Sequence, residues 1–278
     1  MVESRPCPEP VFIPLFESEV VAAADPAVAA EETSNNSGTV VVNVTMDGSP
    51  EDAQVVARNS SGGVVDLVYT NLTDTGTATF ELPLGEYELE IDAGGNHISK
   101  GVNRTITVES GETTSLDVEV TQLYEPNDRG WYAVDPHGHS KFSVDSETPI
   151  ETFVSAQIAA QLDAITVSDH YSVAGHTPTK NLAQEAEMPY ILSQDITSLS
   201  SNGSTTCGHH NTNPLHENEY VNESGSPSEF YEDARDAGAD TIHVNHPYYG
   251  GGIEYFNQMV GTFDFNGSFN AAGVYKRA

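Results

Sequence analysis

The chain has 278 residues, with 10 basic and 42 acidic side chains and a formal net charge of −32. This charge excludes nucleic-acid backbones and anionic membrane surfaces as natural partners, because both would be repelled. Two cysteines exclude a disulfide framework or a thiolate zinc site, and no apolar run approaches the roughly 18 residues that span a bilayer.

The acidic residues are spread along the whole chain and are not gathered in one tail. Such a surface keeps a protein soluble, but its self-repulsion destabilises the compact state unless salt screens it. At molar salt the Debye length falls to about 3 Å, and this repulsion nearly vanishes. We therefore interpret the composition as that of a protein from a halophilic organism. An acidic surface that binds a cationic partner is the alternative.

Residues 1–38 are predicted to form a disordered leader and linker. They have no hydrophobic period, and the apolar piece Val11–Phe16 is short and lacks the basic flank of a signal peptide. Ala22–Ala30 resembles the small-residue surroundings of a cleavage site, and eight Asn-X-Ser/Thr sequons fit an exported chain. We therefore favour an exported or cell-surface protein over a cytoplasmic one.

Residues 39–121 are predicted to form an antiparallel β-sandwich. Apolar and polar residues alternate with a period of two in seven short segments, and glycine-containing turns separate them. The layout resembles the carboxypeptidase-regulatory or transthyretin-like modules of exported enzymes, which implies a spacer or a glycan contact. The predicted strands are Val40–Val44, Ala53–Ala57, Val64–Tyr69, Thr77–Leu82, Tyr87–Ile91, Thr105–Val108 and Leu116–Val120.

Residues 122–278 follow a different pattern, in which short apolar strands alternate with helices. A helix start is predicted at Thr148, as the N-cap of a capping box with Pro149 at the first helical position. Ser226–Glu229 begins a second helix, which Gly238 ends. This alternation predicts βα units of a parallel sheet or barrel. The predicted strands are Trp131–Val134, Ala164–Val167 and Thr241–Val244, and Tyr190–Leu192 is extended.

Histidines and carboxylates follow the ends of these strands, where active residues of such barrels gather. Two histidines spaced two apart on an extended segment point the same way, so His137 and His139 can reach one ion. Imidazoles with bridging carboxylates suit Zn²⁺, Mn²⁺ or Fe²⁺, and such ions promote the hydrolysis of phosphoesters. The segments are Asp135–His139, Ser168–His170, Asp195, Gly208–Asn211 and Asn245–His246.

These residues together resemble the motifs of the polymerase and histidinol phosphatase (PHP) superfamily, in its CehA/McbA-like metallohydrolase branch. Asp135-Pro136-His137-Gly138-His139-Ser140 is similar to its first motif, and Asp145 matches the position of a further ligand. The remaining matches are Leu162–His170, Asp195, Gly208–Asn211 and Asn245-His246-Pro247.

The resemblance implies a distorted βα barrel with two or three divalent ions, and a metal-bound hydroxide that attacks a small phosphoester-type substrate. His137, His139 and Asp195 would hold one ion; Asp195, His209 and His246 a second; Asp145 and His170 a third. The resemblance also implies that Asp169, His170 and Asp195 are the catalytic residues. In that set Asp169 would orient His170. Whether His209 or His210 faces the metal stays open.

The chain departs from the PHP pattern at two points. Asp195 stands where a glutamate is usual, and no Asp-X-His motif follows position 246. We therefore expect a multidomain protein with an incomplete α/β PHP-type barrel, either truncated or with an incomplete site. The alternatives to an enzyme are a non-catalytic surface or binding protein with a degenerate PHP scaffold, or an inactive truncated gene product.

Overall fold

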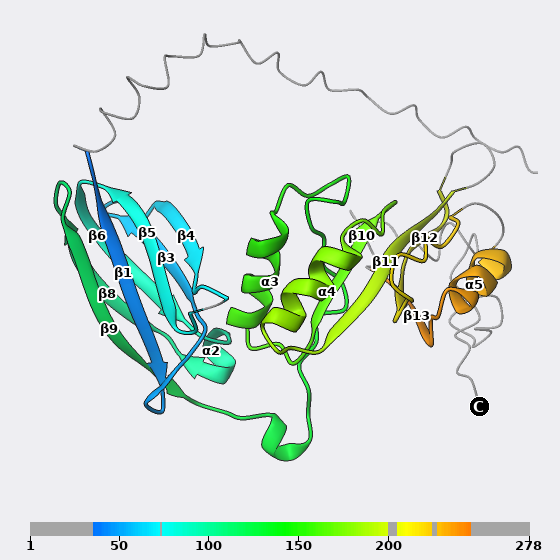
Figure 1. Ribbon diagram of the computed structural model, residues 1–278, viewed down its shortest axis with the longest axis horizontal. Coiled ribbons are helices and arrows are strands. Elements are labelled where there is room, and N and C mark those ends of the chain that lie inside the picture. The colour runs from blue at the N-terminus through cyan, green and yellow to red at the C-terminus, as the bar shows by residue number, and fades with distance from the viewer. Residues whose placement is uncertain (1–35, 73, 200–204, 224–226, 246–278) are drawn as a thin grey trace, which may run out of the picture.

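The computed structural model describes residues 36–72, 74–199, 205–223 and 227–245 (Figure 1). They form a sandwich of two β-sheets, followed by a second part built on a third sheet. Almost all of the predicted leader lies outside the described residues, as do His246 and the remainder of the chain.

The sandwich contains all seven strands that the period-two alternation predicted. Its second sheet has the order β4-β3-β6-β8, and in its first sheet β1 lies between β9 and β5. The first sheet comprises β1 (Ser37–Met46), β2 (Ser49–Pro50), β5 (Thr77–Pro83), β7 (Ser99–Lys100) and β9 (Thr113–Gln122). The second comprises β3 (Gln54–Asn59), β4 (Val64–Tyr69), β6 (Gly85–Asp92) and β8 (Val102–Val108), and the short helix α2 (Gly95–Ile98) follows β6.

One hydrophobic core joins the two sheets. Every second residue of β1 from Val40 to Met46 is buried, and these side chains meet Leu89 and Ile91 of β6 in the same cluster. The prediction of a purely antiparallel sandwich is wrong in one pair, because β1 and β9 run parallel. β9 follows β8 of the opposite sheet, so its direction is not set by a hairpin with β1.

The second part holds one four-stranded sheet in the order β10-β11-β12-β13. β10 and β11 pair in parallel, whereas β12 and β13 pair antiparallel to their neighbours. Its elements are η1 (Asn127–Arg129), α3 (Ile150–Ala159), β10 (Ile165–His170), α4 (His176–Glu185), β11 (Tyr190–Leu199), β12 (Thr205–Asn213), α5 (Pro227–Asp236) and β13 (Thr241–Val244).

The predicted α/β barrel of the PHP type is therefore wrong for the described residues, whose sheets form no barrel. A parallel continuation needs a crossover of a dozen or so residues, usually a helix. Here β12 pairs with β11 as an antiparallel neighbour, so the sheet does not continue in parallel beyond β11. Only α4, between β10 and β11, forms the predicted βα crossover within the described sheet.

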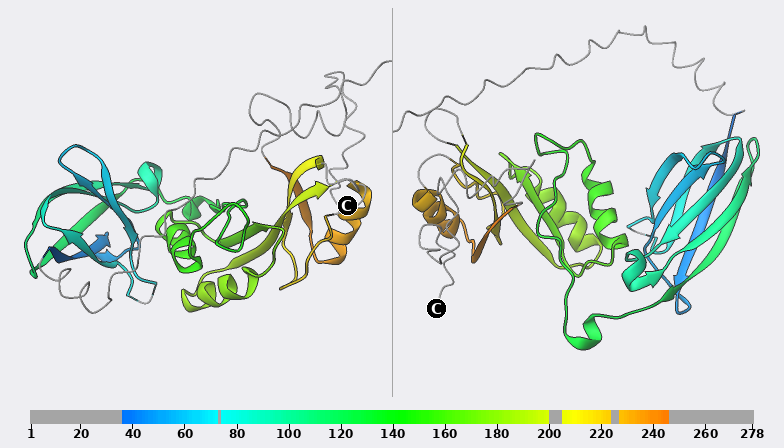
Figure 2. Two further views of the ribbon diagram at one scale, coloured as in Figure 1. Left: turned by 90° about the horizontal axis from the view of Figure 1, so that it is seen from above. Right: turned by 180° about the vertical axis from the view of Figure 1, so that it is seen from behind.

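Helices α3 and α4 pack between the sandwich and β10, whereas α5 lies at the far end of the molecule (Figures 1 and 2). Val154 of α3, Ile165 of β10 and Ala183 of α4 form one buried cluster. A second cluster joins α5 to β11 through Phe230 and Ile196.

Two local predictions about this part are wrong. Helix α3 begins at Ile150, and Pro149 is its N-cap with an extended backbone and no side-chain cap bond, so Thr148 forms no capping box. Trp131–Val134 forms no strand, and Trp131 is 69% exposed. The Asp163 carboxylate instead accepts a hydrogen bond from the Ala133 amide.

The sandwich and the second part meet beside the end of α3. Gln161 donates a 2.8 Å hydrogen bond to Glu51 of the sandwich, and the Gly94 amide donates one to the Ala159 carbonyl. Two grooves of about 540 and 530 Å³ flank this junction, and no predicted metal ligand lines either. No helix among the described residues has the length and apolar character to cross a bilayer.

Candidate metal centre

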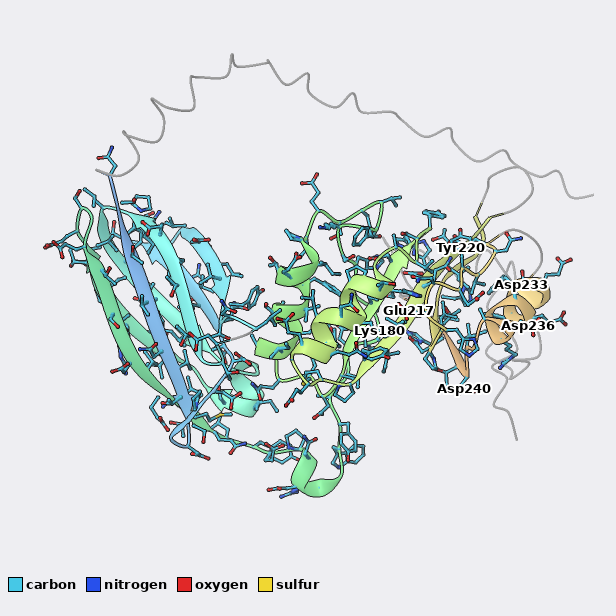
Figure 3. All side chains as sticks on the ribbon, in the orientation of Figure 1. Lys180, Glu217, Tyr220, Asp233, Asp236 and Asp240 are labelled. Atoms are coloured by element: carbon cyan, nitrogen blue, oxygen red, sulfur yellow. The ribbon has the colours of Figure 1, made fainter. Side chains whose placement is uncertain are left out.

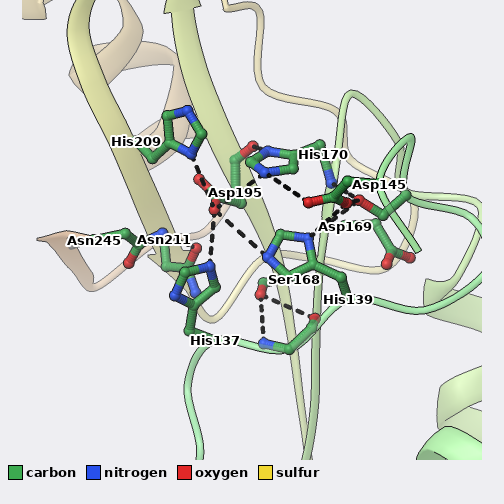
Figure 4. Close-up of polar contacts among 12 residues, drawn as sticks. His137, His139, Asp145, Ser168, Asp169, His170, Asp195, His209, Asn211 and Asn245 are labelled. Carbon is green, nitrogen blue, oxygen red and sulfur yellow. Dashed lines mark hydrogen bonds and ion pairs between the residues drawn. The ribbon is translucent and has the colours of Figure 1, made fainter. Parts of the chain in front are cut away.

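Six of the seven predicted metal ligands converge in one place (Figure 4). They come from the segment before α3, the end of β10, the middle of β11 and β12. Strand pairing sets part of this arrangement, because His170 lies opposite Asp195 and Thr197 lies opposite His209. The six are His137, His139, Asp145, His170, Asp195 and His209, and the seventh, His246, lies outside the described residues.

The Asp195 carboxylate is the hub of this cluster. Its side chain is fully buried, and four imidazole nitrogens from three different segments face its Oδ2 atom. The distances to Oδ2 are 3.1 Å from His137 Nε2, 3.8 Å from His139 Nε2, 3.7 Å from His170 Nε2 and 3.8 Å from His209 Nδ1.

The electrostatics of Asp195 favour its charged form. Burial raises the pKa of this carboxyl, but the His137 contact and the charges of His170 and His209 outweigh it, so the pKa lies below its ordinary value. No described donor is aligned to donate a hydrogen bond to either carboxylate oxygen, although His137 Nε2 lies 3.1 Å from Oδ2. Burial of a charged carboxylate without hydrogen bonds destabilises the fold unless a cation compensates the charge.

A second group of ligands adjoins the first. His139 Nδ1 lies 3.4 Å from Asp145 Oδ1, and His170 Nε2 lies 3.7 Å from Asp145 Oδ2. Asp145 is half exposed, so this side of the cluster faces solvent. The Ser143 hydrogen bond and the nearby histidines hold the pKa of Asp145 below its ordinary value despite the opposing effect of burial.

Hydrogen bonds at the Nδ1 atoms of His139 and His170 determine the tautomers of the two rings. The Asp195 backbone carbonyl can only accept, so His170 Nδ1, at 3.2 Å, carries the proton. Ser143 Oγ donates to Asp145 and therefore accepts from His139 Nδ1 at 3.1 Å. Both rings then turn an Nε2 lone pair toward Asp195 Oδ2, an arrangement that is repulsive until a cation lies between them.

The segment that carries His137 and His139 is held by its backbone. Ser168 of β10 accepts a 3.0 Å hydrogen bond from the Gly138 amide and donates one to the Gly138 carbonyl. Asn211 of β12 donates to the Pro136 carbonyl. Because a Cβ at position 138 would meet the Phe153 ring at 2.9 Å, glycine is the residue that fits between the two ligands.

Asp169 has a different partner from the one predicted. Its buried carboxylate accepts hydrogen bonds from the backbone amide and the hydroxyl of Ser140, at 2.6 and 2.9 Å. It therefore holds the residue after His139 and does not anchor the His170 ring. Burial raises the pKa of the Asp169 carboxyl.

The structure distinguishes His209 from His210. Adjacent residues of a strand face opposite sides, and His209 faces Asp195. His210 is fully buried on the other side, where Tyr231 Oη lies 3.2 Å from its Nε2. His243 is close to the cluster but its Nδ1 faces Asn213, at 3.3 Å, and burial and the His137 charge lower its pKa.

The residues present fit divalent transition-metal ions. Zinc–nitrogen distances of about 2.1 Å in a tetrahedral site place neighbouring ligand atoms about 3.4 Å apart. The separations around Asp195 Oδ2, from 3.1 to 3.8 Å, are of this size. Among the residues that the structure describes, three ligand groups overlap, and His139, His170 and Asp195 each belong to two of them. The groups are His137–His139–Asp195, His139–Asp145–His170 and His170–Asp195–His209.

Several supporting residues escaped the sequence analysis. Ser143 and Ser168 orient ligands, and Glu223 lies buried beside β11. Ser143 and Ser168 each stand two residues before a predicted ligand, a spacing that offered a signal. Glu223 lies on a different segment of the chain from every ligand, and no local pattern marks it.

Comparisons with known proteins add no family to this description. No protein-family model matches the chain, and no curated protein matches it. Solved structures with similarity include the Bacillus anthracis TIE protein, at 23% identity and a TM-score of 0.27 over 31% of this chain and 16% of that one. The minor pilin GBS52 of Streptococcus agalactiae has 15% identity and a TM-score of 0.27, over 33% and 47%.

A DUF3823 family protein from Parabacteroides merdae has 21% identity and a TM-score of 0.23, over 33% of this chain and 49% of that one. The chain thus spans less than half of the length of each of these three structures.

Proposed function

We propose that the chain is a divalent-metal-dependent hydrolase that acts on phosphoester-type substrates. The observation that carries the proposal is the fully buried Asp195 carboxylate with four imidazole nitrogens within 3.8 Å of one oxygen. The motif resemblance to PHP metallohydrolases supports the same reaction class.

The protein residues have distinct tasks in this proposal. The cations would lie among the three ligand groups, where they supply Lewis acidity and the positive charge that an anionic substrate requires. Asp195 bridges two groups. His139 donates its Nδ1–H to Ser143 Oγ, and His170 donates its Nδ1–H to the Asp195 backbone carbonyl, which leaves each Nε2 free to bind a cation. Asp145, half exposed, lies on the side from which a substrate would approach.

The acidic surface makes the cations necessary for substrate binding. A net charge of −32 repels a phosphate ester in bulk solution, so attraction must come from charge localised in the site. Phosphoryl transfer is catalysed mainly by positioning and by electrostatic stabilisation, which a cluster of cations provides.

The test combines metal analysis with hydrolysis of an aryl phosphate. Purified protein equilibrated with Zn²⁺ or Mn²⁺ in high salt should retain more than one ion per chain and release the aryl alcohol. His137→Ala should abolish hydrolysis and reduce the bound metal. His216→Ala, which removes an exposed histidine outside the cluster, should change neither. Retention of the ions without any hydrolysis would instead support a non-catalytic binding protein.

A further inference from the structure

Glu223 is a buried acid that the proposed mechanism does not use. It lies on the segment between β12 and α5 and is 5% exposed. Burial raises the pKa of this carboxyl to about 7. The described part of the chain places no basic side chain in hydrogen-bonding or ion-pair contact with it. A carboxylate in such a position needs another reason for its burial.

Three neutral donors surround Glu223. Gln194 Nε2 donates to Oε1 at 2.6 Å, and Tyr220 Oη donates to the same oxygen at 3.3 Å. The Thr197 backbone amide donates to Oε2 at 3.0 Å. Tyr220 lies on the same segment, beside the strands of the third sheet (Figure 3).

Two of these donors belong to β11 and lie on either side of Asp195. Gln194 precedes Asp195, and its side chain also exchanges hydrogen bonds with the Val221 backbone, donating at 3.1 Å and accepting at 2.9 Å. Thr197 follows Asp195 by two residues. Hydrogen bonds to residues on both sides of Asp195 therefore attach the segment around Glu223 to β11.

The same contacts reach His170. Thr197 Oγ1 lies 3.3 Å from His170 Nδ1, the nitrogen that also faces the Asp195 carbonyl at 3.2 Å. Glu223 fixes the Thr197 backbone, so it also fixes the surroundings of the His170 proton. Outer partners of this kind orient the ligands and tune the affinity of a metal site.

We propose that Glu223 is a positioning residue that holds Asp195 and His170 in their metal-binding geometry. This inference rests on the proposed function, because it presumes that these side chains bind a cation. The role requires an acceptor at both oxygens, and the two oxygens of the Glu223 carboxyl group supply it.

Glutamine at position 223 has the same shape but not the same hydrogen-bonding capacity. Its amide nitrogen would face either the Thr197 amide or the Gln194 amide nitrogen, and each of these is a donor. One bond to β11 is therefore lost whichever way the amide turns.

The test is a Co²⁺ titration followed by visible absorption, because the d–d bands of Co²⁺ report ligand geometry. We expect Glu223→Gln to weaken Co²⁺ binding by about 10–100-fold and to change the spectrum, the usual effect of losing an outer partner. Tyr220→Phe removes only the longest of the three bonds and should leave affinity near that of the wild type. Glu219→Gln removes the same charge from the same segment at an exposed position and is the matched control.

The outcomes separate this inference from the proposed function. Wild-type Co²⁺ affinity and spectrum in Glu223→Gln would overturn the positioning role and leave the metal site intact. A wild-type protein that binds no Co²⁺ would overturn both. If Glu223→Gln fails to fold, Glu223→Asp takes its place, because it keeps the carboxylate but shortens its reach to the Gln194 and Thr197 donors by one methylene. An unchanged spectrum in that variant overturns the inference.

Discussion

His170 and Asp195 lie opposite each other on parallel strands, and His170 faces two different oxygens of its partner. Nδ1 lies 3.2 Å from the Asp195 backbone carbonyl, and Nε2 lies 3.7 Å from the Asp195 carboxylate. The backbone oxygen fixes the ring, and the carboxylate shares the position at which a cation would bind. Strand register alone therefore sets one ligand pair of the site.

Loss of the Asp195 charge should remove most of the metal affinity. Asp195→Asn keeps the shape of the side chain but removes the anionic oxygen that four imidazoles face, so we expect affinity for Zn²⁺ or Mn²⁺ to fall by at least about 100-fold. Isothermal titration calorimetry measures the change. Asp240→Asn, an exposed residue near β13, is the control and should bind as the wild type does. Equal affinity in both variants would show that Asp195 is not a ligand.

The absence of a side chain at Gly138 should be important for packing against Phe153. Gly138→Ala places a Cβ 2.9 Å from the Phe153 ring, so we expect a destabilisation of about 1–3 kcal/mol and weaker metal binding. Phe153→Leu in the same chain makes room and should restore much of both. A double-mutant cycle from chemical denaturation measures the coupling. Additive effects of the two substitutions would contradict a steric origin.

The Glu223 carboxyl group should make the free energy of unfolding depend on pH. Its pKa is raised from 4.5 to about 7 on folding, so the folded state binds more protons than the unfolded state between these values. The free energy of unfolding should then fall as pH rises from 4.5 to 7, by at most about 3 kcal/mol from this group. Glu223→Gln should lack this part of the slope, measured by urea denaturation of metal-free protein. Parallel slopes in the two proteins would rule the assignment out.

Salt should stabilise the chain strongly. Carboxylates such as Asp233, Asp236 and Asp240 are exposed (Figure 3), and screening weakens their mutual repulsion. We expect the midpoint of thermal unfolding to rise by about 10 °C between 0.1 and 2 M KCl, equivalent to a few kcal/mol. Sucrose at the same osmolality is the control for a general solute effect. A midpoint that stays constant or falls in KCl would contradict the interpretation of the composition as halophilic.

The sandwich was predictable from sequence because its strands each bury one face. The alternation from Val40 to Met46 marks β1 without any knowledge of its neighbours. The parallel pairing of β1 with β9 was not predictable, because alternation carries no information about strand direction.

The convergence of the site residues was predictable from the apolar runs that precede them in sequence, although only His170 stands at the end of a strand in the structure. His137, His139, His170 and Asp195 follow apolar runs or stand within one, and they meet in space. The barrel prediction was wrong because the local pattern of strand, helix and strand does not say whether the next strand continues in parallel. β12 escaped prediction because its sequence is polar on both faces, with His209 at the site and His210 buried against Tyr231.

The arrangement around Asp195 has a consequence for folding. His137 and Asp195 are distant in sequence, and a cation bound between them would close a long loop, as a covalent cross-link does. Binding to the native state alone then shifts the unfolding equilibrium by mass action. The metal-bound protein should therefore resist heat and proteases better than the apoprotein. Metal binding then also stabilises the fold that forms the site.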